Sequence, residues 1–256
     1  MSAYYESEYG KLYFGDCLEI MPSLQEKVEL VLTDPPYGTT QCKWDSVIPL
    51  EKMWEAIRTC CRNNSAILLF SDGIFMCNLM QSNEKEWRYN LVWDKVLTTG
   101  FLNANKMPLR KHEEICVFYR SLPVYNPQKK MGEKNHGNRK PKIKGSENYN
   151  TYESVDNSEK LGSLKHPTSI ISIPKSHPSI VTHPTQKPVA LMEYLIRTYT
   201  NFGDTVLDFT IGSGTTAVAA INTGRKFIGV EKEEKYCEIA KQRIIEAEEK
   251  MKEFEV

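Results

Sequence analysis

The sequence predicts an α/β protein with a doubly wound, mostly parallel sheet and an inserted lobe. Three observations support this fold class. Short apolar, β-branched runs alternate with helical patterns, a proline-rich turn and a glycine-rich turn each follow such a run, and one long basic segment interrupts the alternation. Strands that alternate with helices are typical of parallel sheets, whose ligands bind at the carboxyl ends of the strands.

Seven short runs have the composition of buried strands. They cover residues 11–14, 28–32, 66–70, 89–93, 113–119, 205–209 and 226–230.

Helical patterns lie between several of these runs. Segments 47–61 and 188–200 have apolar residues at spacings of three and four, and 215–224 ends in a glycine suited to a helix C-terminus. The C-terminal segment 235–254 has an apolar stripe, which we expect to pack on the sheet; a dimer seam is the alternative. The stripe comprises Tyr236, Ala240, Ile244, Ala247, Met251 and Phe254.

Composition favours an ordinary cytoplasmic protein. The 256 residues are 40% hydrophobic and 26% charged, and the N-terminus lacks the basic and apolar regions of a signal peptide. No apolar run approaches the roughly 20 residues of a membrane span. Seven scattered cysteines and five histidines without ligand spacing predict neither a disulfide framework nor a metal site.

The net charge of zero conceals a basic segment. Residues 106–144 contain eleven Lys or Arg against three Glu, which fits a phosphate-facing surface and equally a solvated loop. Residues 121–182 are polar and too long for an ordinary connection, and their aromatic residues favour a functional lobe over a disordered insert. Candidate nucleic-acid-binding residues are Lys106, Arg110, Lys111, Arg139 and Lys140.

The proline-rich turn "TDPPYG" occupies residues 33–38, directly after the run at 28–32. Its prolines exclude both a helix and a central strand, so the chain turns there. Asp34 and Tyr37 are then left side by side at the carboxyl end of a strand, where a ligand would bind. A plain structural turn is the alternative.

The glycine-rich turn predicts an adenosine-type ligand. In "VLDFTIGSGTTAVAA" (206–220), Gly212 and Gly214 let the backbone approach a ligand, and Thr215 and Thr216 begin a helix. Glu231 ends the next strand, where an acid can take both ribose hydroxyls.

S-adenosylmethionine suits this turn better than a dinucleotide. The dinucleotide fingerprint needs a third glycine where Ala217 stands, because its helix must cradle a pyrophosphate. S-adenosylmethionine has no pyrophosphate, and Lys187 of "HPTQKP" (183–188), near a helix N-terminus, suits its carboxylate.

Together these motifs resemble the β group of amino-methylating DNA methyltransferases. "GDCLEIMPSL…ELVLTDPPYG", "HPTQKPVALMEYLI" and "VLDFTIGSGTTAVAA…FIGVE" follow that group's order, and the resemblance spans roughly residues 11–120 and 183–245. It implies a seven-stranded, Rossmann-like fold with circularly permuted motifs. Residues 1–120 would be the catalytic half, 121–182 the target-recognition insert and 183–256 the half that binds S-adenosylmethionine.

The resemblance also assigns cofactor-binding residues. Asp16 would accept a hydrogen bond from the adenine amine of the cofactor, and Thr185 and Asp208 belong to the matched motifs. One departure concerns the cofactor turn, which in the family reads D-P-F-x-G-S-G. Here Phe209 stands one position earlier, which puts the usual aromatic contact with the cofactor in doubt.

The implied activity is methyl transfer from S-adenosylmethionine to N6 of a flipped-out adenine in double-stranded DNA. The Asp34 carboxylate and the Pro35 carbonyl would accept the two amine hydrogens, Pro36 would keep the turn rigid, and Tyr37 would stack on the base. The closest alternative is N4 of cytosine. Enzymes acting there more often have serine in place of Asp34, so adenine is favoured.

Methylation of RNA or protein, a NAD-dependent oxidoreductase and a non-catalytic DNA-binding protein fit the motifs less well. A cognate restriction endonuclease and a second copy of the chain are the expected protein partners.

Overall fold

The computed structural model describes residues 2–39, 46–132, 164–175 and 186–254. Contacts divide the chain into two units: residues 1–126 together with 169–256, and residues 127–168. The first unit therefore combines both predicted halves with the two ends of the predicted insert, and the second lies inside that insert.

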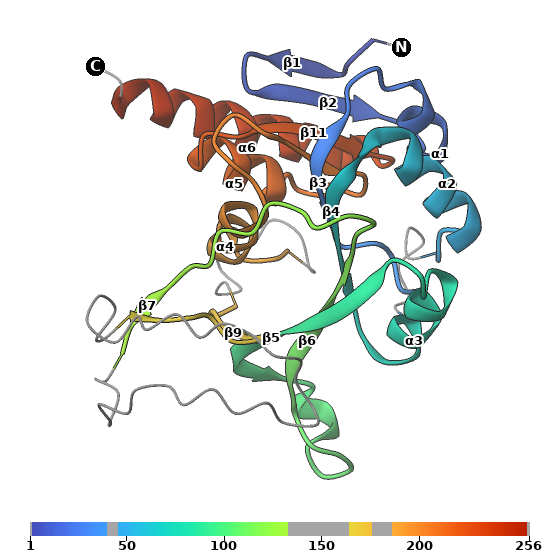
Figure 1. The fold of residues 1–256 in the computed structure, drawn as a ribbon, viewed down its shortest axis with the longest axis vertical. Coiled ribbons are helices and arrows are strands. Elements are labelled where there is room, and N and C mark those ends of the chain that lie inside the picture. The colour runs from blue at the N-terminus through green and yellow to red at the C-terminus, as the bar shows by residue number, and fades with distance from the viewer. Residues whose placement is uncertain (1, 40–45, 133–163, 176–185, 255–256) are drawn as a thin grey trace, which may run out of the picture. The chain divides into compact units, whose positions relative to one another are not determined.

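Nine strands form one sheet within the described residues, in the order β1-β2-β11-β10-β3-β4-β6-β5-β9 (Figure 1). The run from β2 to β4 is parallel, β5 pairs in parallel with β9, and β6 lies antiparallel between β4 and β5. The strands are β1 (Tyr5–Ser7), β2 (Gly10–Phe14), β3 (Val28–Thr33), β4 (Cys61–Ser71), β5 (Trp87–Thr99), β6 (Arg110–Phe118), β9 (Ile170–Ser172), β10 (Thr205–Asp208) and β11 (Lys226–Glu231).

Helices cover both faces of this sheet, which gives the first unit two hydrophobic cores. The helices are α1 (Cys17–Ile20), α2 (Leu50–Cys60), α3 (Gly73–Ser82), α4 (Val189–Tyr199), α5 (Thr215–Asn222) and α6 (Glu234–Phe254), with short 3₁₀ turns at Met21–Ser23 and Phe101–Asn103. Leu30 and Leu32 of β3 pack with α4, α5 and α6, whereas Val31 packs with α1, α2 and α3. This alternation is the pattern of a strand buried on both faces.

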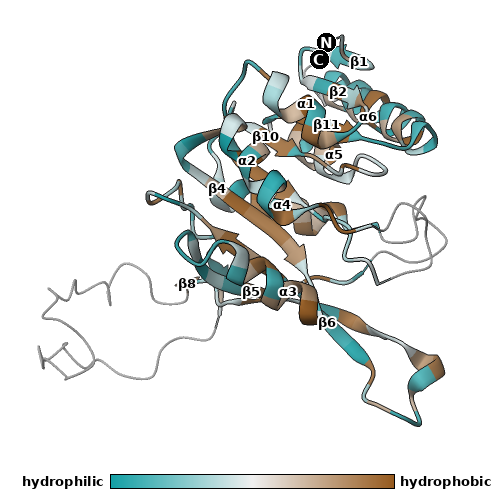
Figure 2. Cartoon of the chain, turned by 90° about the vertical axis from the view of Figure 1, so that its right-hand side faces the viewer, coloured by the Kyte–Doolittle hydropathy of each residue, from teal (hydrophilic) through white to brown (hydrophobic). Residues whose placement is uncertain are grey.

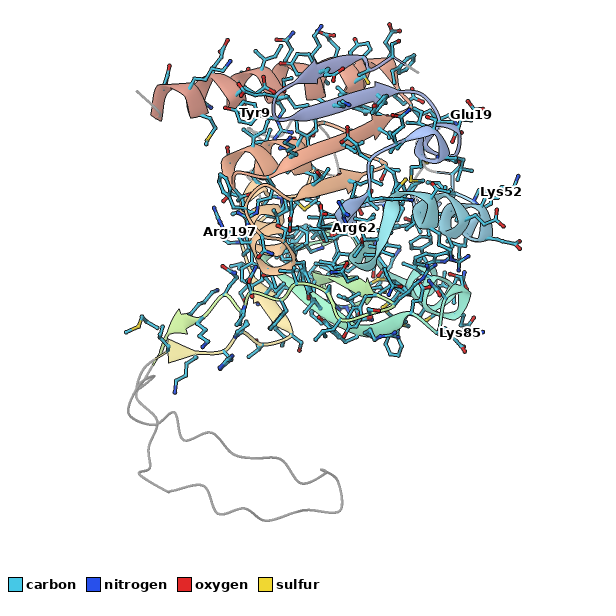
Figure 3. The ribbon with its side chains drawn as sticks, turned by 45° about the horizontal axis from the view of Figure 1, so that its top comes forward. Tyr9, Glu19, Lys52, Arg62, Lys85 and Arg197 are labelled. Carbon is cyan, nitrogen blue, oxygen red and sulfur yellow. The ribbon has the colours of Figure 1, made fainter. Side chains whose placement is uncertain are left out.

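The solvent-facing sides of the helices are charged. Lys52 of α2 and Arg197 of α4 point away from the sheet (Figure 3), and Arg197 pairs with Glu193 one turn earlier at 3.2 Å. On α6, Ala240, Ile244 and Ala247 of the predicted stripe are buried in the core, so this helix packs on the sheet as expected.

The predicted fold class is confirmed, and each of the seven predicted runs lies in or overlaps a strand. The count of seven is incomplete because β1 and β9 add short edge strands, and β4, β5 and β6 extend beyond their predicted starts or ends. Segment 47–61 was also predicted too long, since α2 ends at Cys60 and Cys61 begins β4.

The second unit contains one short antiparallel pair among its described residues. β7 (Lys130–Met131) pairs with β8 (Leu164–Lys165). No helix in the described parts of the chain is both long and apolar enough to cross a membrane.

Candidate active site

A cavity of about 480 Å³ opens at the carboxyl ends of β3, β10 and β11. Its size is that of a small-molecule pocket. The proline-rich and glycine-rich turns predicted from the sequence both line it, as do residues of β5, β6, α4 and α6. The predicted residues on its wall are Asp16, Asp34, Pro35, Pro36, Tyr37, Arg110, Lys187, Asp208, Gly212, Thr215, Thr216 and Glu231.

Asp34 is held on both of its carboxylate oxygens. The Tyr37 hydroxyl donates to Oδ1 at 2.6 Å, and Lys187 Nζ donates to Oδ2 at 2.6 Å. The Tyr37 ring stacks on Phe75 of α3, with ring centroids 5.0 Å apart. Burial, and then the nearby Asp34 carboxylate, raise the pKa of Tyr37 well above its ordinary value, so its hydroxyl stays protonated and continues to donate.

Lys187 belongs to a row of alternating charges. Its ammonium lies 3.1 Å from Glu113 Oε2, and Lys95 Nζ lies 3.2 Å from Glu113 Oε1, so the row runs Asp34, Lys187, Glu113, Lys95. Both lysines are buried. The Lys187 ammonium also lies 4.9 Å from the centre of the Phe70 ring, a cation–π distance.

This row keeps Glu113 and Lys187 charged despite burial. Burial alone would raise the pKa of Glu113, but the ammonium groups of Lys187 and Lys95 outweigh it and hold that pKa below the ordinary value. Burial alone would lower the pKa of Lys187, but Asp34 and Glu113 outweigh it and hold that pKa above the ordinary value. Buried ions persist only with such partners.

The glycine-rich turn has the geometry of a ligand-binding loop. Gly212 and Gly214 have φ of +54° and +81°, a region that favours glycine. A Cβ added at Gly212 would meet nothing closer than the Thr210 carbonyl at 4.0 Å, so a ligand can approach this backbone. Glu231 accepts from the backbone amides of Gly212 and Glu233, each at 2.8 Å, and thereby fixes the turn.

A network of hydroxyl groups joins the two turns. Thr33 Oγ1 donates to Asp208 Oδ1 at 2.6 Å and lies 2.7 Å from Thr210 Oγ1. Thr210 Oγ1 in turn donates to the Asp34 carbonyl at 3.1 Å, and Thr216 Oγ1 donates to Asp208 Oδ2 at 2.5 Å. The Asp208 carboxylate is therefore directed into the protein, where it orients both turns.

Several predicted residues have partners that the sequence did not reveal. Lys187 was expected at a cofactor carboxylate, yet in the structure it is shared by two protein carboxylates. Phe209 is buried in the core and forms part of the cavity wall. Asp16 caps α1 by accepting from the Leu18 amide at 2.9 Å and presents its side chain to the cavity. Gly214 lets the turn pack closely on Ala240 of α6, because a Cβ at this position would lie 3.0 Å from Ala240 Cα.

The predicted DNA-binding residues divide between described and undescribed parts of the chain. Arg110 pairs with Asp72 at 3.3 Å, Lys111 lies 3.6 Å from Asp94, and Lys106 is exposed. Outside the described residues lie Thr185, Arg139 and Lys140.

Residues that no sequence motif indicates complete the site. In the sequence Glu113 is only the first residue of the predicted strand 113–119 and one acid of a basic segment, and the stacking role of Phe75 has no signal there. Trp93, which is 1% exposed and lies beside the cavity, belongs to a run predicted correctly as a strand.

Comparison with known proteins identifies the family of this chain. The profile of the N6_N4_Mtase family, described as DNA methylase, matches residues 28–242. The type II methyltransferase M.BglII of Bacillus subtilis is 29% identical over 94% of this chain and 70% of its own length. M1.MboII of Moraxella bovis is 26% identical over 90% of this chain and 94% of its own length.

Solved structures share the fold. The cytosine-N4-specific PvuII DNA methyltransferase superimposes with a TM-score of 0.67 at 18% identity, covering 94% of this chain and 88% of its own. The complex of M1.HpyAVI with SAM superimposes with a TM-score of 0.64 at 24% identity, covering 92% of this chain and 98% of its own. Because the family profile covers most of the chain, this protein belongs to the family of amino-methylating DNA methylases, whose methyl donor is S-adenosylmethionine.

Proposed function

We propose that the enzyme methylates N6 of adenine at a specific sequence in double-stranded DNA, with N4 of cytosine as the second candidate. The observation that carries the proposal is the carboxylate of Asp34, held on both oxygens at the wall of the cavity. By resemblance, enzymes that act on cytosine more often have serine at this position.

Asp34 would prepare the amine for attack. An exocyclic amine is a poor nucleophile because its lone pair is delocalised into the ring. The Asp34 carboxylate and the Pro35 carbonyl would accept hydrogen bonds from its two N–H groups and draw the nitrogen towards tetrahedral geometry. Each carboxylate oxygen has two lone pairs, so Asp34 can accept an amine hydrogen while it keeps Lys187 and Tyr37. The Lys187 ammonium, 2.6 Å from Oδ2, also holds the carboxylate in place.

The residues around the glycine turn fit S-adenosylmethionine. The open backbone at Gly212 would lie along it, and Glu231 and Asp16 at the ends of adjacent strands would face its ribose and adenine. These carboxylates also suit a ligand that has a sulfonium charge. When bound, S-adenosylmethionine supplies an electrophilic methyl group for direct in-line transfer.

Several parts of the proposal extend beyond the cavity. An amine inside a duplex is paired and shielded, so the base would be extruded at a cost of about a few kcal/mol. The segment 121–182 would recognise the target sequence. A separately encoded cognate endonuclease, a homodimer and a cytoplasmic location stay predictions.

The test is to express the chain in cells that lack DNA methylation and to analyse their DNA as nucleosides by mass spectrometry. We expect N6-methyladenine with the wild type, none with Asp34→Ala, and the wild-type level with Glu238→Ala, which removes an exposed acid of α6. N4-methylcytosine would overturn the adenine assignment. Neither product, despite S-adenosylmethionine binding by calorimetry, would refute DNA methylation by this chain.

A further inference from the structure

The hairpin of β5 and β6 extends beyond the edge of the sheet where the cavity opens. Ser71, the last residue of β4, pairs with Glu114, so the part of β6 that precedes Glu114 runs past the carboxyl end of β4. The last four residues of β5 and the connection to β6, together residues 96–109, are here called the apical segment. Figure 2 shows this hairpin reaching past the helices that cover the sheet.

The apical segment presents apolar side chains to solvent. Phe101 is 80% exposed and Leu102 is 97% exposed, and more than half of Leu97 and Met107 is exposed as well. A single exposed apolar residue is ordinary, but four within residues 97–107 form an apolar patch that belongs to neither hydrophobic core of the described residues.

The charge around this patch indicates its partner. No acidic residue occurs between Lys95 and His112, whereas Lys106, Arg110 and Lys111 are basic. Arg110 pairs with Asp72 and Lys111 with Asp94, but both basic side chains stay more than half exposed. A polyanion is attracted to such a surface, and a second copy would bring the same positive charges against it. Proteins that insert between stacked bases do so with apolar side chains that are presented from a basic surface.

The backbone of the hairpin has an irregular conformation at the start of the apical segment. Val96 has φ of +63°, a left-handed conformation that is rare for a β-branched residue. Asp94 Oδ1 accepts from the Val96 amide at 2.9 Å, and the pairing of β5 with β6 shifts register between Asp94 and Thr99. Such irregularities redirect a strand, and strained residues cluster at functional sites.

Two strands connect the apical segment with the cavity. Trp93 of β5 and Arg110 and Glu113 of β6 line the cavity, so the segment begins within three residues of the cavity wall on one side and ends beside it on the other. A duplex whose target base enters the cavity would therefore meet the apical segment next to that base.

We propose that Phe101 and Leu102 form an apolar wedge that enters the duplex beside the target base and occupies the space left when that base is extruded. The inference rests on the proposed methylation of duplex DNA. It assigns to the apical segment the task of opening the base pair, which is separate from holding the amine at Asp34.

The test compares two DNA substrates. The recognition sequence is first read from the methylated DNA of expressing cells. Transfer of tritiated methyl groups is then measured on a duplex with that sequence, and on the same duplex with an abasic site opposite the target base. For Phe101→Ser/Leu102→Ser we expect a loss of about tenfold or more in kcat/KM on the intact duplex, because extrusion is no longer supported. On the abasic duplex, where no pair must open, we expect a loss of less than about threefold.

Two control variants define the result. Phe202→Ser removes an aromatic residue that is 83% exposed at the amino end of β10, away from the cavity, and should leave both rates unchanged. Phe101→Leu should retain most of the rate on the intact duplex because it keeps an apolar side chain at the tip. Thermal unfolding and S-adenosylmethionine binding should be unchanged in all variants.

Three outcomes would overturn the proposal. They are an unchanged rate on the intact duplex, an equal loss on both substrates, or a change from dimer to monomer in sedimentation, which would make the apical segment a contact between copies. If the wild type methylates neither duplex nor any cellular DNA, the proposed function fails instead.

Discussion

Replacing Lys187 by methionine removes the ammonium group that lies between Asp34 and Glu113. Methionine keeps a similar length and volume, so the change is mainly one of charge. The ammonium is 2.6 Å from Asp34 Oδ2 and 3.1 Å from Glu113 Oε2. Without it, two negative charges face each other in a site where less than a quarter of either side chain is exposed.

The geometry gives the size of the effect. Two oxygens that share one nitrogen at these distances are no more than about 6 Å apart, and at an effective dielectric constant of about 20 their repulsion is about 3 kcal/mol. In the wild type the Lys187 ammonium offsets this repulsion, and in the variant it no longer does. Lys95 still pairs with Glu113 at 3.2 Å, so Asp34 is the carboxylate that is left without its cation and pushed from its position. A displaced Asp34 is a poor acceptor for an amine hydrogen.

The expected result is a slower transfer step. Single-turnover methyl transfer should fall about 100-fold in Lys187→Met, because a misplacement of about 1 Å costs about that factor. Lys175→Met, which removes another lysine from the cavity wall, should leave the rate unchanged. A wild-type single-turnover rate in Lys187→Met would refute the argument that Lys187 positions Asp34.

Three further predictions concern stability and are measured by urea unfolding. Burial raises the pKa of Asp208 from 3.8 to about 6, so protonation of this carboxyl stabilises the folded state. That contribution to the free energy of unfolding is complete below about pH 4 and is lost as the pH rises through 6. Asp208→Asn should remove this pH dependence of about 3 kcal/mol, and a variant whose stability changes with pH as the wild type's does would contradict it. Gly214→Ala should destabilise by about 2 kcal/mol, because φ is +81° and the new Cβ would lie 3.0 Å from Ala240 Cα; an unchanged midpoint would exclude this reasoning. Val96→Gly should stabilise by about 1 kcal/mol by relieving a left-handed valine, and a loss of stability would show that the Val96 side chain contributes more than its backbone strain costs.

Strand composition made most of the sheet predictable. A strand buried on both faces is apolar at nearly every position, as in "VELVL", where Glu29 is the one polar residue, and it needs no knowledge of its neighbours to be recognised. The edge strands β1 and β9 are only three residues long and contain polar residues, so they depend on the strands beside them. α3 escaped prediction because its apolar residues are not confined to one face: Phe75 and Leu79 are buried, while Ile74 is exposed.

The site was predictable where a local motif positions a group, and not where the register of distant strands does. Asp34 and Tyr37 are three residues apart in one turn, and their hydrogen bond follows from that turn. The contact of Asp34 with Lys187 spans 153 residues, and Glu113 reaches Lys187 only because β6 pairs with β4 in one register. A one-residue shift would turn the Glu113 side chain to the other face of the sheet.

The adjacency of β3 and β10 explains how motifs far apart in the chain make one site. Val206 pairs with Leu30 and Leu207 with Val31, so the proline-rich turn that follows β3 and the glycine-rich turn that follows β10 emerge side by side. Thr33 and Thr210 then join the turns by hydrogen bonds. Because this alignment depends on pairing and not on chain order, the half containing Asp34 can precede the half containing Gly212 without changing the geometry between them. Thr210, at the position where the family usually has phenylalanine, thus supports the Asp34 backbone, and the sequence departure has a structural use within the protein itself.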